Sequence, residues 1–128
     1  MANISVVFPK TGKEPVVMPD LEGVLSGEPI TWQIYTQNQG IKSVKLAFDS
    51  GNFFEGSKAG PNVCLKNLTF RNGNGYAVML GMAPDLEKRR VDKYTIYGYS
   101  GPDGGGAEMA VLDPTIVTDP PATPIHQP

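Results

Sequence analysis

Apolar and polar residues alternate along two segments of the chain, Ile30–Tyr35 and Ser43–Phe48. Residues two apart in an extended strand point to the same side of a sheet, so this pattern predicts two half-buried strands. The predicted inward side chains are Ile30, Trp32, Ile34, Val44, Leu46 and Phe48. We therefore expect Trp32 to lie in the core.

The alternation is also present in Val91–Tyr99, where Tyr94, Ile96 and Gly98 share one face. Tyr97 and Tyr99 then fall on the opposite face, together with Lys93 and Thr95. This pattern predicts a row of tyrosines on the outer surface of a sheet.

Short runs of β-branched and aromatic residues recur about every dozen residues and are separated by turn residues. These runs are Ile4–Phe8, Pro15–Met18, Ile30–Tyr35, Ser43–Phe48, Val63–Phe70, Tyr76–Leu80, Val91–Tyr99, Ala107–Leu112 and Thr115–Val117. With 15 glycines and 12 prolines to form turns, the pattern predicts an all-β fold, a single antiparallel or mixed β-sandwich.

Three segments do not fit a strand. Pro84–Arg90 is the one helical candidate, of one or two turns, because proline starts the segment and acidic residues precede basic ones. Ser100–Gly106 holds three consecutive glycines and is expected to be a flexible loop. Residues 119–128 contain four prolines, which predicts an extended tail after a sandwich domain of residues 1–118.

The chain is poor in side chains for catalysis. Its one histidine, His126, lies in the proline-rich tail, and its one cysteine, Cys64, lies between two apolar residues. Acid-base, nucleophilic and soft-metal chemistry mostly depend on these two residue types. We therefore expect no enzyme activity, no cofactor and no metal.

Net charge and targeting signals limit the classes of partner and the cellular location that we expect. The 11 Lys and Arg residues nearly balance the 13 Asp and Glu residues, giving a net charge of -2. Such a balance predicts no nucleic-acid partner and no membrane partner. Because this chain shows no secretory signal, a cytoplasmic location is expected. A component of a phage or secreted assembly is the alternative.

Two blocks of the sequence resemble cupredoxins. Pro15–Met18, an acidic turn and Gly27–Trp32 form the first block, and Lys93–Gly98 is similar to the strand that delivers the copper cysteine. Met109–Val117 resembles the last strand pair. Gly98 stands where the family has its cysteine, and the two histidine ligands have no counterpart. The resemblance implies a cupredoxin-like sandwich without type 1 copper, with an immunoglobulin-like Greek key as the alternative.

Two candidate binding regions remain. The first is Tyr97 and Tyr99, beside the glycine loop, and the second is the loop of amide side chains that includes Gln37, Asn38 and Gln39. Loops at one end of a sandwich often converge into one recognition patch. The candidate site residues are Tyr97, Tyr99, Gln37, Asn38, Gln39, Asp103 and, in the tail, Ile125.

We expect a non-catalytic protein-interaction or assembly module, such as a structural or accessory subunit of a bacterial or phage assembly. In this role the chain binds a protein partner or itself. The alternative is a sandwich that binds a small ligand or a carbohydrate through the tyrosines and the amide loop, Thr36–Gly40.

Overall fold

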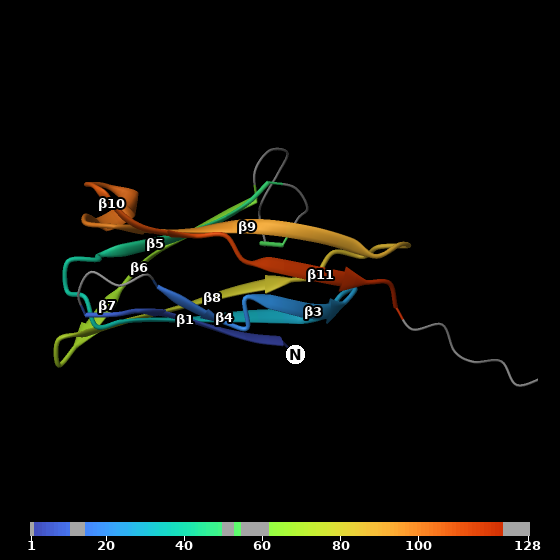
Figure 1. Cartoon of the computed structure of the whole chain (residues 1–128), viewed down its shortest axis with the longest axis horizontal. Coiled ribbons are helices and arrows are strands. Elements are labelled where there is room, and N and C mark those ends of the chain that lie inside the picture. The colour runs from blue at the N-terminus through green and yellow to red at the C-terminus, as the bar shows by residue number, and fades with distance from the viewer. Residues whose placement is uncertain (1, 11–14, 50–52, 55–61, 122–128) are drawn as a thin grey trace, which may run out of the picture.

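Two β-sheets pack face to face in the computed structural model, which describes residues 2–10, 15–49, 53–54 and 62–121. Figure 1 shows the two layers, with β9, β10 and β5 in one and β1, β4 and β8 in the other. The predicted all-β sandwich is confirmed. Both sheets are mixed, with one parallel pair each.

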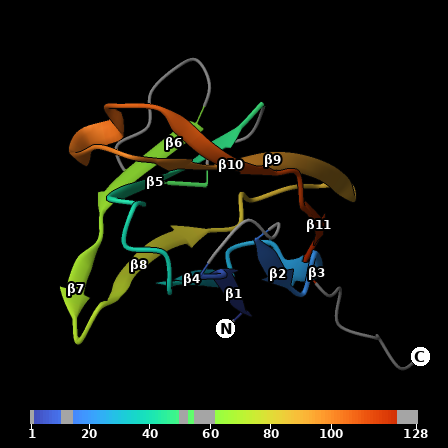
Figure 2. The same ribbon diagram turned by 60° about the vertical axis from the view of Figure 1, so that its left-hand side comes forward.

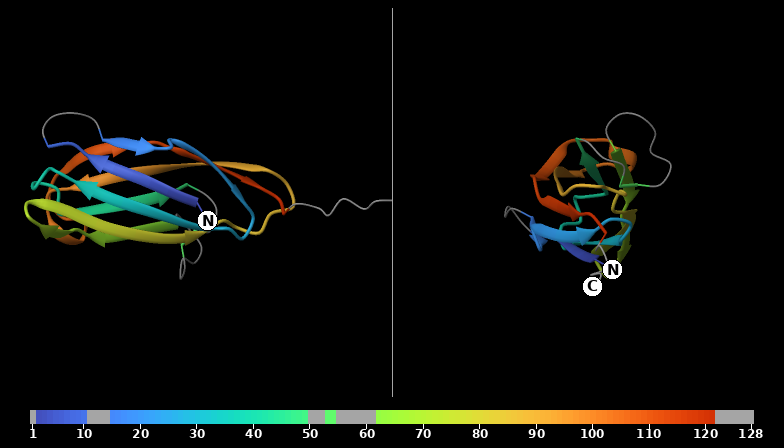
Figure 3. Two further views of the ribbon diagram at one scale, coloured as in Figure 1. Left: turned by 90° about the horizontal axis from the view of Figure 1, so that it is seen from below. Right: turned by 90° about the vertical axis from the view of Figure 1, so that its right-hand side faces the viewer.

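Sheet 1 has the strand order β2-β1-β4-β8-β7. Its strands are β1 (Ala2–Phe8), β2 (Val16–Met18), β4 (Pro29–Thr36), β7 (Thr69–Arg71) and β8 (Asn74–Met82). β1 and β4 run parallel, and the other neighbours run antiparallel. β8 therefore lies near one border of the sheet, and among the described strands of this sheet only the three-residue β7 lies beyond it (Figure 3).

Sheet 2 has the order β3-β11-β9-β5-β6. β11 pairs with the first half of β9, residues 90–93, and β10 pairs with its second half, residues 96–99. The strands of this sheet are β3 (Leu21–Leu25), β5 (Ser43–Phe48), β6 (Asn62–Asn67), β9 (Arg90–Tyr99), β10 (Glu108–Leu112) and β11 (Thr115–Asp119). β9 is central, because β5 flanks one side while β10 and β11 share the other. Figure 2 shows β9 and β10 side by side above sheet 1.

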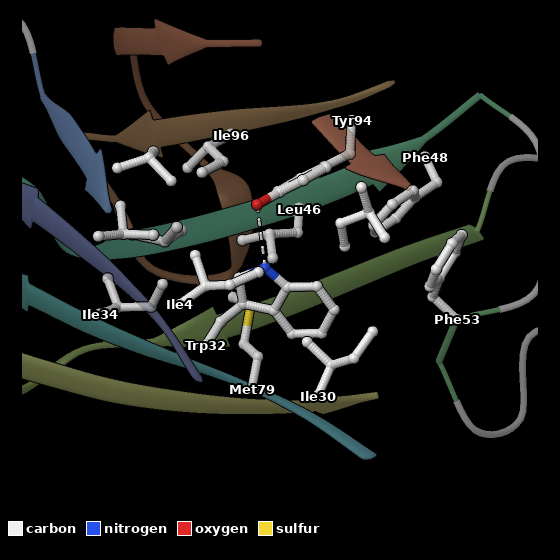
Figure 4. Close-up of a cluster of buried hydrophobic side chains, with 14 of the residues drawn as sticks. Ile4, Ile30, Trp32, Ile34, Leu46, Phe48, Phe53, Met79, Tyr94 and Ile96 are labelled. Atoms are coloured by element: carbon white, nitrogen blue, oxygen red, sulfur yellow. Dashed lines mark hydrogen bonds between the residues drawn. The ribbon is translucent and has the colours of Figure 1, made fainter. Parts of the chain in front are cut away.

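Alternating side chains from both sheets fill the core. Trp32 is 0% exposed, as predicted, and its indole Nε1–H donates a hydrogen bond to the Tyr94 hydroxyl at 3.2 Å (Figure 4). Phe48 stacks on Tyr94 and on Phe53, with ring centroids 4.6 and 4.0 Å apart. A Cβ at Gly81 would lie 2.8 Å from the Trp32 ring, so only glycine fits there.

Two predicted strand assignments are corrected. The segment between Met18 and Gly27, predicted to be an acidic turn, instead contains β3, which pairs in parallel with β11. Val63–Phe70 was expected to be one strand, but it divides at Leu68, whose N–H donates to the Lys42 carbonyl at 2.9 Å. The two halves then join different sheets, β6 in sheet 2 and β7 in sheet 1.

The predicted helix at Pro84–Arg90 is wrong. Residues 83–89 have no helical structure, and Arg90 begins β9. Their backbone finds partners outside the segment, because the Ala83 N–H donates to the Glu28 carbonyl and the Leu86 N–H donates to Ser26 Oγ. These contacts replace the hydrogen bonds that a helix would form within itself.

The glycine loop was expected to be flexible, but hydrogen bonds hold it in a defined shape. It contains a short 3-10 turn, Pro102–Gly104. Ser43 Oγ donates to the Gly101 carbonyl at 2.7 Å and accepts from the Gly104 N–H at 2.9 Å. One buried hydroxyl on β5 therefore supports both ends of the turn.

The boundary predicted after residue 118 falls inside β11, which includes Asp119. The Asp119 carbonyl accepts hydrogen bonds from the N–H and hydroxyl of Ser26, and its carboxylate pairs with Arg89. Residues 122–128 lie outside the described part of the chain.

Candidate binding site

Tyr97 and Tyr99 lie on the outer face of sheet 2, on the side predicted for them. Both are half-buried, and their rings stack with centroids 6.2 Å apart. The Lys45 ammonium lies over both rings, 4.5 Å from the centroid of Tyr97 and 5.5 Å from that of Tyr99. The chain's own lysine therefore covers this tyrosine pair.

Asp103 lies at the same end of sheet 2, in the 3-10 turn. Its carboxylate accepts a hydrogen bond from Asn67 Nδ2 at 2.9 Å, and its N–H donates to Asn67 Oδ1 at 2.7 Å. This pair of bonds ties the turn to β6. Asp103 thus has a structural partner within the chain.

The amide loop between β4 and β5 divides its side chains between two tasks. The Asn38 carboxamide accepts a hydrogen bond from the Gly40 N–H at 2.8 Å, and the Asn38 N–H donates to Thr36 Oγ1 at 2.9 Å. Asn38 therefore shapes the loop. Gln37 and Gln39 instead line a cleft on the sheet 1 side.

This polar cleft has a volume of about 270 Å³ and is formed by the amide loop, the β7–β8 turn and the end of β1. The described residues that line it are Lys10, Gln37, Gln39, Asn72, Gly73 and Asn74. Gly73 has a φ of +81°, and a Cβ there would lie 2.8 Å from Gln39 Nε2. The positive φ favours glycine at this position, and the amide of Gln39 lies against the turn.

A second pair of tyrosines lies beside the polar cleft. Tyr35 on β4 is directly opposite Tyr76 on β8, and their ring centroids are 5.2 Å apart. Tyr76 is 46% exposed. Since Asn74 lies two residues before Tyr76 on the same strand, both side chains point to the outer face of sheet 1.

The rest of β8 presents an apolar outer surface, the β8 stripe. Its members Val78, Leu80 and Met82 are 54%, 68% and 55% exposed. They alternate with the inward residues of the strand, of which Met79 is fully buried. Large apolar side chains exposed in a row mark interaction surfaces more often than isolated ones do.

The outer backbone edge of β8 has no described strand beside it between the residues that pair with β7 and Met82. The Met82 N–H donates to the Phe53 carbonyl at 2.8 Å, so even-numbered residues of β8 turn their backbone groups away from β4. β7 pairs only with residues 74–76. No described residue pairs with Val78 or Leu80 on this outer side.

A further hollow of about 270 Å³ lies between β2 and the β10–β11 junction. Valines, prolines and two carboxylates line it: Pro15, Val16, Val17, Asp20, Leu112, Asp113 and Pro114. Lys93 Nζ lies 3.6 Å from Asp113 Oδ2. No group of three or more His, Cys, Asp or Glu side chains within the described ranges could hold a metal ion.

The Cys64 thiol is partly buried and packs against the core. Burial raises its pKa above the ordinary value, and the nearby Lys66 charge opposes this effect. A thiol with a raised pKa is a poor nucleophile at neutral pH, so the structure gives Cys64 a packing role.

The predicted site residues therefore lie in separate places. Tyr97, Tyr99 and Asp103 belong to sheet 2, while Gln37 and Gln39 open toward sheet 1, and Ile125 lies outside the described residues. The sequence interpretation missed the Tyr35–Tyr76 pair and the β7–β8 turn. The pair Asn72-Gly73, with φ of +53° and +81°, is a strong hairpin signal that locates this turn.

Comparison of the sequence with protein-family models and with curated proteins found no match. In the described ranges, no helix has the length and apolarity needed to span a membrane.

Proposed function

We propose that this protein is a non-catalytic assembly module that associates with a second copy of itself through the edge of β8. The observation that supports this proposal is the combination of a backbone edge that no described residue pairs with at Val78 and Leu80 and the β8 stripe beside it. An exposed, apolar edge strand is a template for pairing with another strand.

The composition of β8 favours pairing between identical strands. Residues 74–82 include no charged side chain and no proline, so the strand lacks two of the usual features that block edge association. Two antiparallel copies related by a two-fold axis at Met79 would place Val78 of one opposite Leu80 of the other. Beyond these residues β7 occupies the edge at Tyr76 and Phe53 occupies it at Met82, so the contact is confined to residues 78–80 of each copy. It is self-complementary and brings no like charges together.

The cupredoxin resemblance is a second part of the proposal. At Gly98, where that family has its copper cysteine, a Cβ would lie 3.3 Å from Phe8 and 3.5 Å from Ile41. The position faces apolar side chains rather than polar ligands. These apolar neighbours fit the copper-free form of the cupredoxin-like sandwich that we propose, which would serve as a structural or accessory subunit.

Leu80→Lys tests the assembly proposal, with Val91→Lys as its matched control. Leu80 and Val91 are 68% and 60% exposed, so neither change should alter stability by more than about 0.5 kcal/mol. We expect sedimentation velocity to show concentration-dependent association of the wild type and of Val91→Lys. Leu80→Lys should weaken it by about tenfold or more, because two ammonium groups meet across the two-fold axis.

A truncation after Pro121 separates this proposal from association through the tail. The truncation keeps Asp119 and its contacts with Ser26 and Arg89. The edge proposal expects unchanged association of the truncated chain. A wild type that stays monomeric, or a Leu80→Lys variant that associates as well as the wild type, would contradict pairing through β8.

A further inference from the structure

The polar cleft beside Tyr35 and Tyr76 has the chemical composition of a ligand site. Among its six described lining residues are four carboxamides, of Gln37, Gln39, Asn72 and Asn74, and one ammonium, of Lys10. Each carboxamide offers both donors and an acceptor. The described lining includes no carboxylate, so the cleft does not repel neutral or anionic ligands.

These four carboxamides are also available. None of them forms a hydrogen bond with another described residue. Two other amides of the chain behave differently, because Asn38 accepts from the Gly40 N–H and Asn67 pairs with Asp103. The side chains of the cleft therefore have their bonding capacity directed to solvent or to a ligand.

Strand register places the Tyr35–Tyr76 pair next to the carboxamides of the cleft. Tyr35 pairs with Tyr76 and Thr36 pairs with Gly75, so the next residue of the β4 side, Gln37, approaches Asn74. Tyr76 and Asn74 share the outer face of β8. An exposed aromatic ring thus adjoins two free carboxamides at one end of sheet 1.

The combination selects among ligand classes. A phosphate-rich ligand needs several cations or a nest of N–H groups, and the described lining supplies only Lys10 as a cation. A wholly apolar ligand would strip water from four carboxamides without replacing their hydrogen bonds. A pyranose ring presents an apolar C–H face to an aromatic ring and hydroxyl groups to amides.

We propose that the polar cleft and Tyr76 bind a saccharide, with one pyranose ring against Tyr76 and its hydroxyl groups bonded to Gln37 and Asn74. This site is independent of the edge at Val78 and Leu80. Lys10 adds a cation that would favour a uronic acid over a neutral sugar. Two kinds of ligand share this chemistry, and the experiment separates them.

Nitrogen-15 NMR reads out the site directly, because each Asn and Gln carboxamide gives its own pair of side-chain signals. The full chain is titrated with cellotetraose as the neutral probe and with tetragalacturonic acid as the acidic probe, after a screen on a glycan array that contains both classes. We expect the signals of Gln37, Gln39, Asn72 and Asn74 to shift, while that of Asn67 stays. A stronger response to the acid, lost in Lys10→Gln, would assign a uronic acid.

Matched variants test the role of each group. Tyr76→Ala should weaken binding by about tenfold and Tyr76→Phe by less than about twofold, since the ring face rather than the hydroxyl makes the contact. Asn74→Ala should weaken it by about fivefold, whereas Asn3→Ala, an exposed carboxamide at the far end of β1, should have no effect.

The proposal is overturned by an array without any bound glycan together with unshifted cleft amides in both titrations. Shifts confined to the Tyr97–Tyr99 face would also overturn it. Leu80→Lys should bind the saccharide as the wild type does, so failure of the assembly proposal leaves this result unchanged.

Discussion

The two outer faces of the sandwich use their tyrosines in different ways. On sheet 2 the rings of Tyr97 and Tyr99 stack under the ammonium of Lys45. On sheet 1 no described cation lies over Tyr35 or Tyr76, and Tyr76 remains 46% exposed. The availability of an aromatic ring therefore depends on its cross-strand neighbours and not on residue type alone.

The two longest strands extend this comparison. β9 has 10 residues and charged side chains, and it lies between β5 on one side and β10 and β11 on the other. β8 has nine residues and no charge, and on its outer side the described partners are the short β7 and the Phe53 carbonyl, which is bonded to Met82. An uncharged apolar strand at a border is unusual for a protein that avoids edge contacts. The charged strand is central and the uncharged strand lies at a border, which is why we propose that the protein associates through sheet 1.

Trp32→Ala should have the largest effect, because the indole lies in the core that both sheets share. Trp32 is 0% exposed and contacts the rings of Phe48, Phe54 and Tyr94. Its removal should lower the free energy of unfolding by about 3 to 5 kcal/mol and disrupt the outer surfaces of both sheets together. Urea unfolding followed by circular dichroism measures this change.

The outward neighbour Thr31 provides the control for that substitution. Thr31→Ala should change the free energy of unfolding by less than about 0.5 kcal/mol. Fluorescence typical of a water-exposed indole in the folded wild type would contradict the buried position of Trp32.

Alkaline pH should distinguish the buried tyrosine from the outer ones. Tyr94 is 1% exposed, and desolvation raises the pKa of its hydroxyl above the ordinary value. Above about pH 10 the unfolded chain loses this proton while the folded chain keeps it, so Tyr94 lowers stability by about 1.4 kcal/mol per pH unit. Below that pH the group has no effect on the pH dependence.

Tyr94→Phe is the matched variant for the alkaline prediction. It should reduce the slope of unfolding free energy against pH above 10, although it also leaves Trp32 Nε1 without its partner at all pH values. An unchanged slope would show that Tyr94 ionises as readily in the folded protein as in the unfolded one.

Much of the sandwich could be predicted because apolar and polar residues alternate in two of its central strands, which indicates the buried face of each. The alternation in Ile30–Tyr35 and Ser43–Phe48 matches β4 and β5 to within one residue at each end. β3 could not be predicted in this way, because Glu22 and Gly23 interrupt the apolar residues of Leu21–Leu25. Its extended form comes from parallel pairing with β11, which is distant in sequence.

The site was harder to predict than the fold because it depends on which loops meet. The amide side chains of Gln37 and Gln39 mark them as candidate binding residues, but the sequence does not indicate which other segment of the chain lies beside them. Asn72-Gly73 marks a hairpin, and only the register of β4 with β8 brings that turn to the amide loop. Likewise, Lys45 covers Tyr97 only because β5 and β9 pair at those residues.

Lys45→Gln should have the smallest effect and tests the covered face alone. Loss of an ammonium from above the two half-buried rings of Tyr97 and Tyr99 costs about 0.5 to 1 kcal/mol, so the urea midpoint should fall slightly with an unchanged slope. Lys66→Gln on the neighbouring strand β6 removes the same charge without a ring contact among the described residues, and it should leave the midpoint unchanged. If both variants behave alike, the ammonium contributes only its general charge. The contrast between the covered and the open tyrosine pair would then rest on exposure alone.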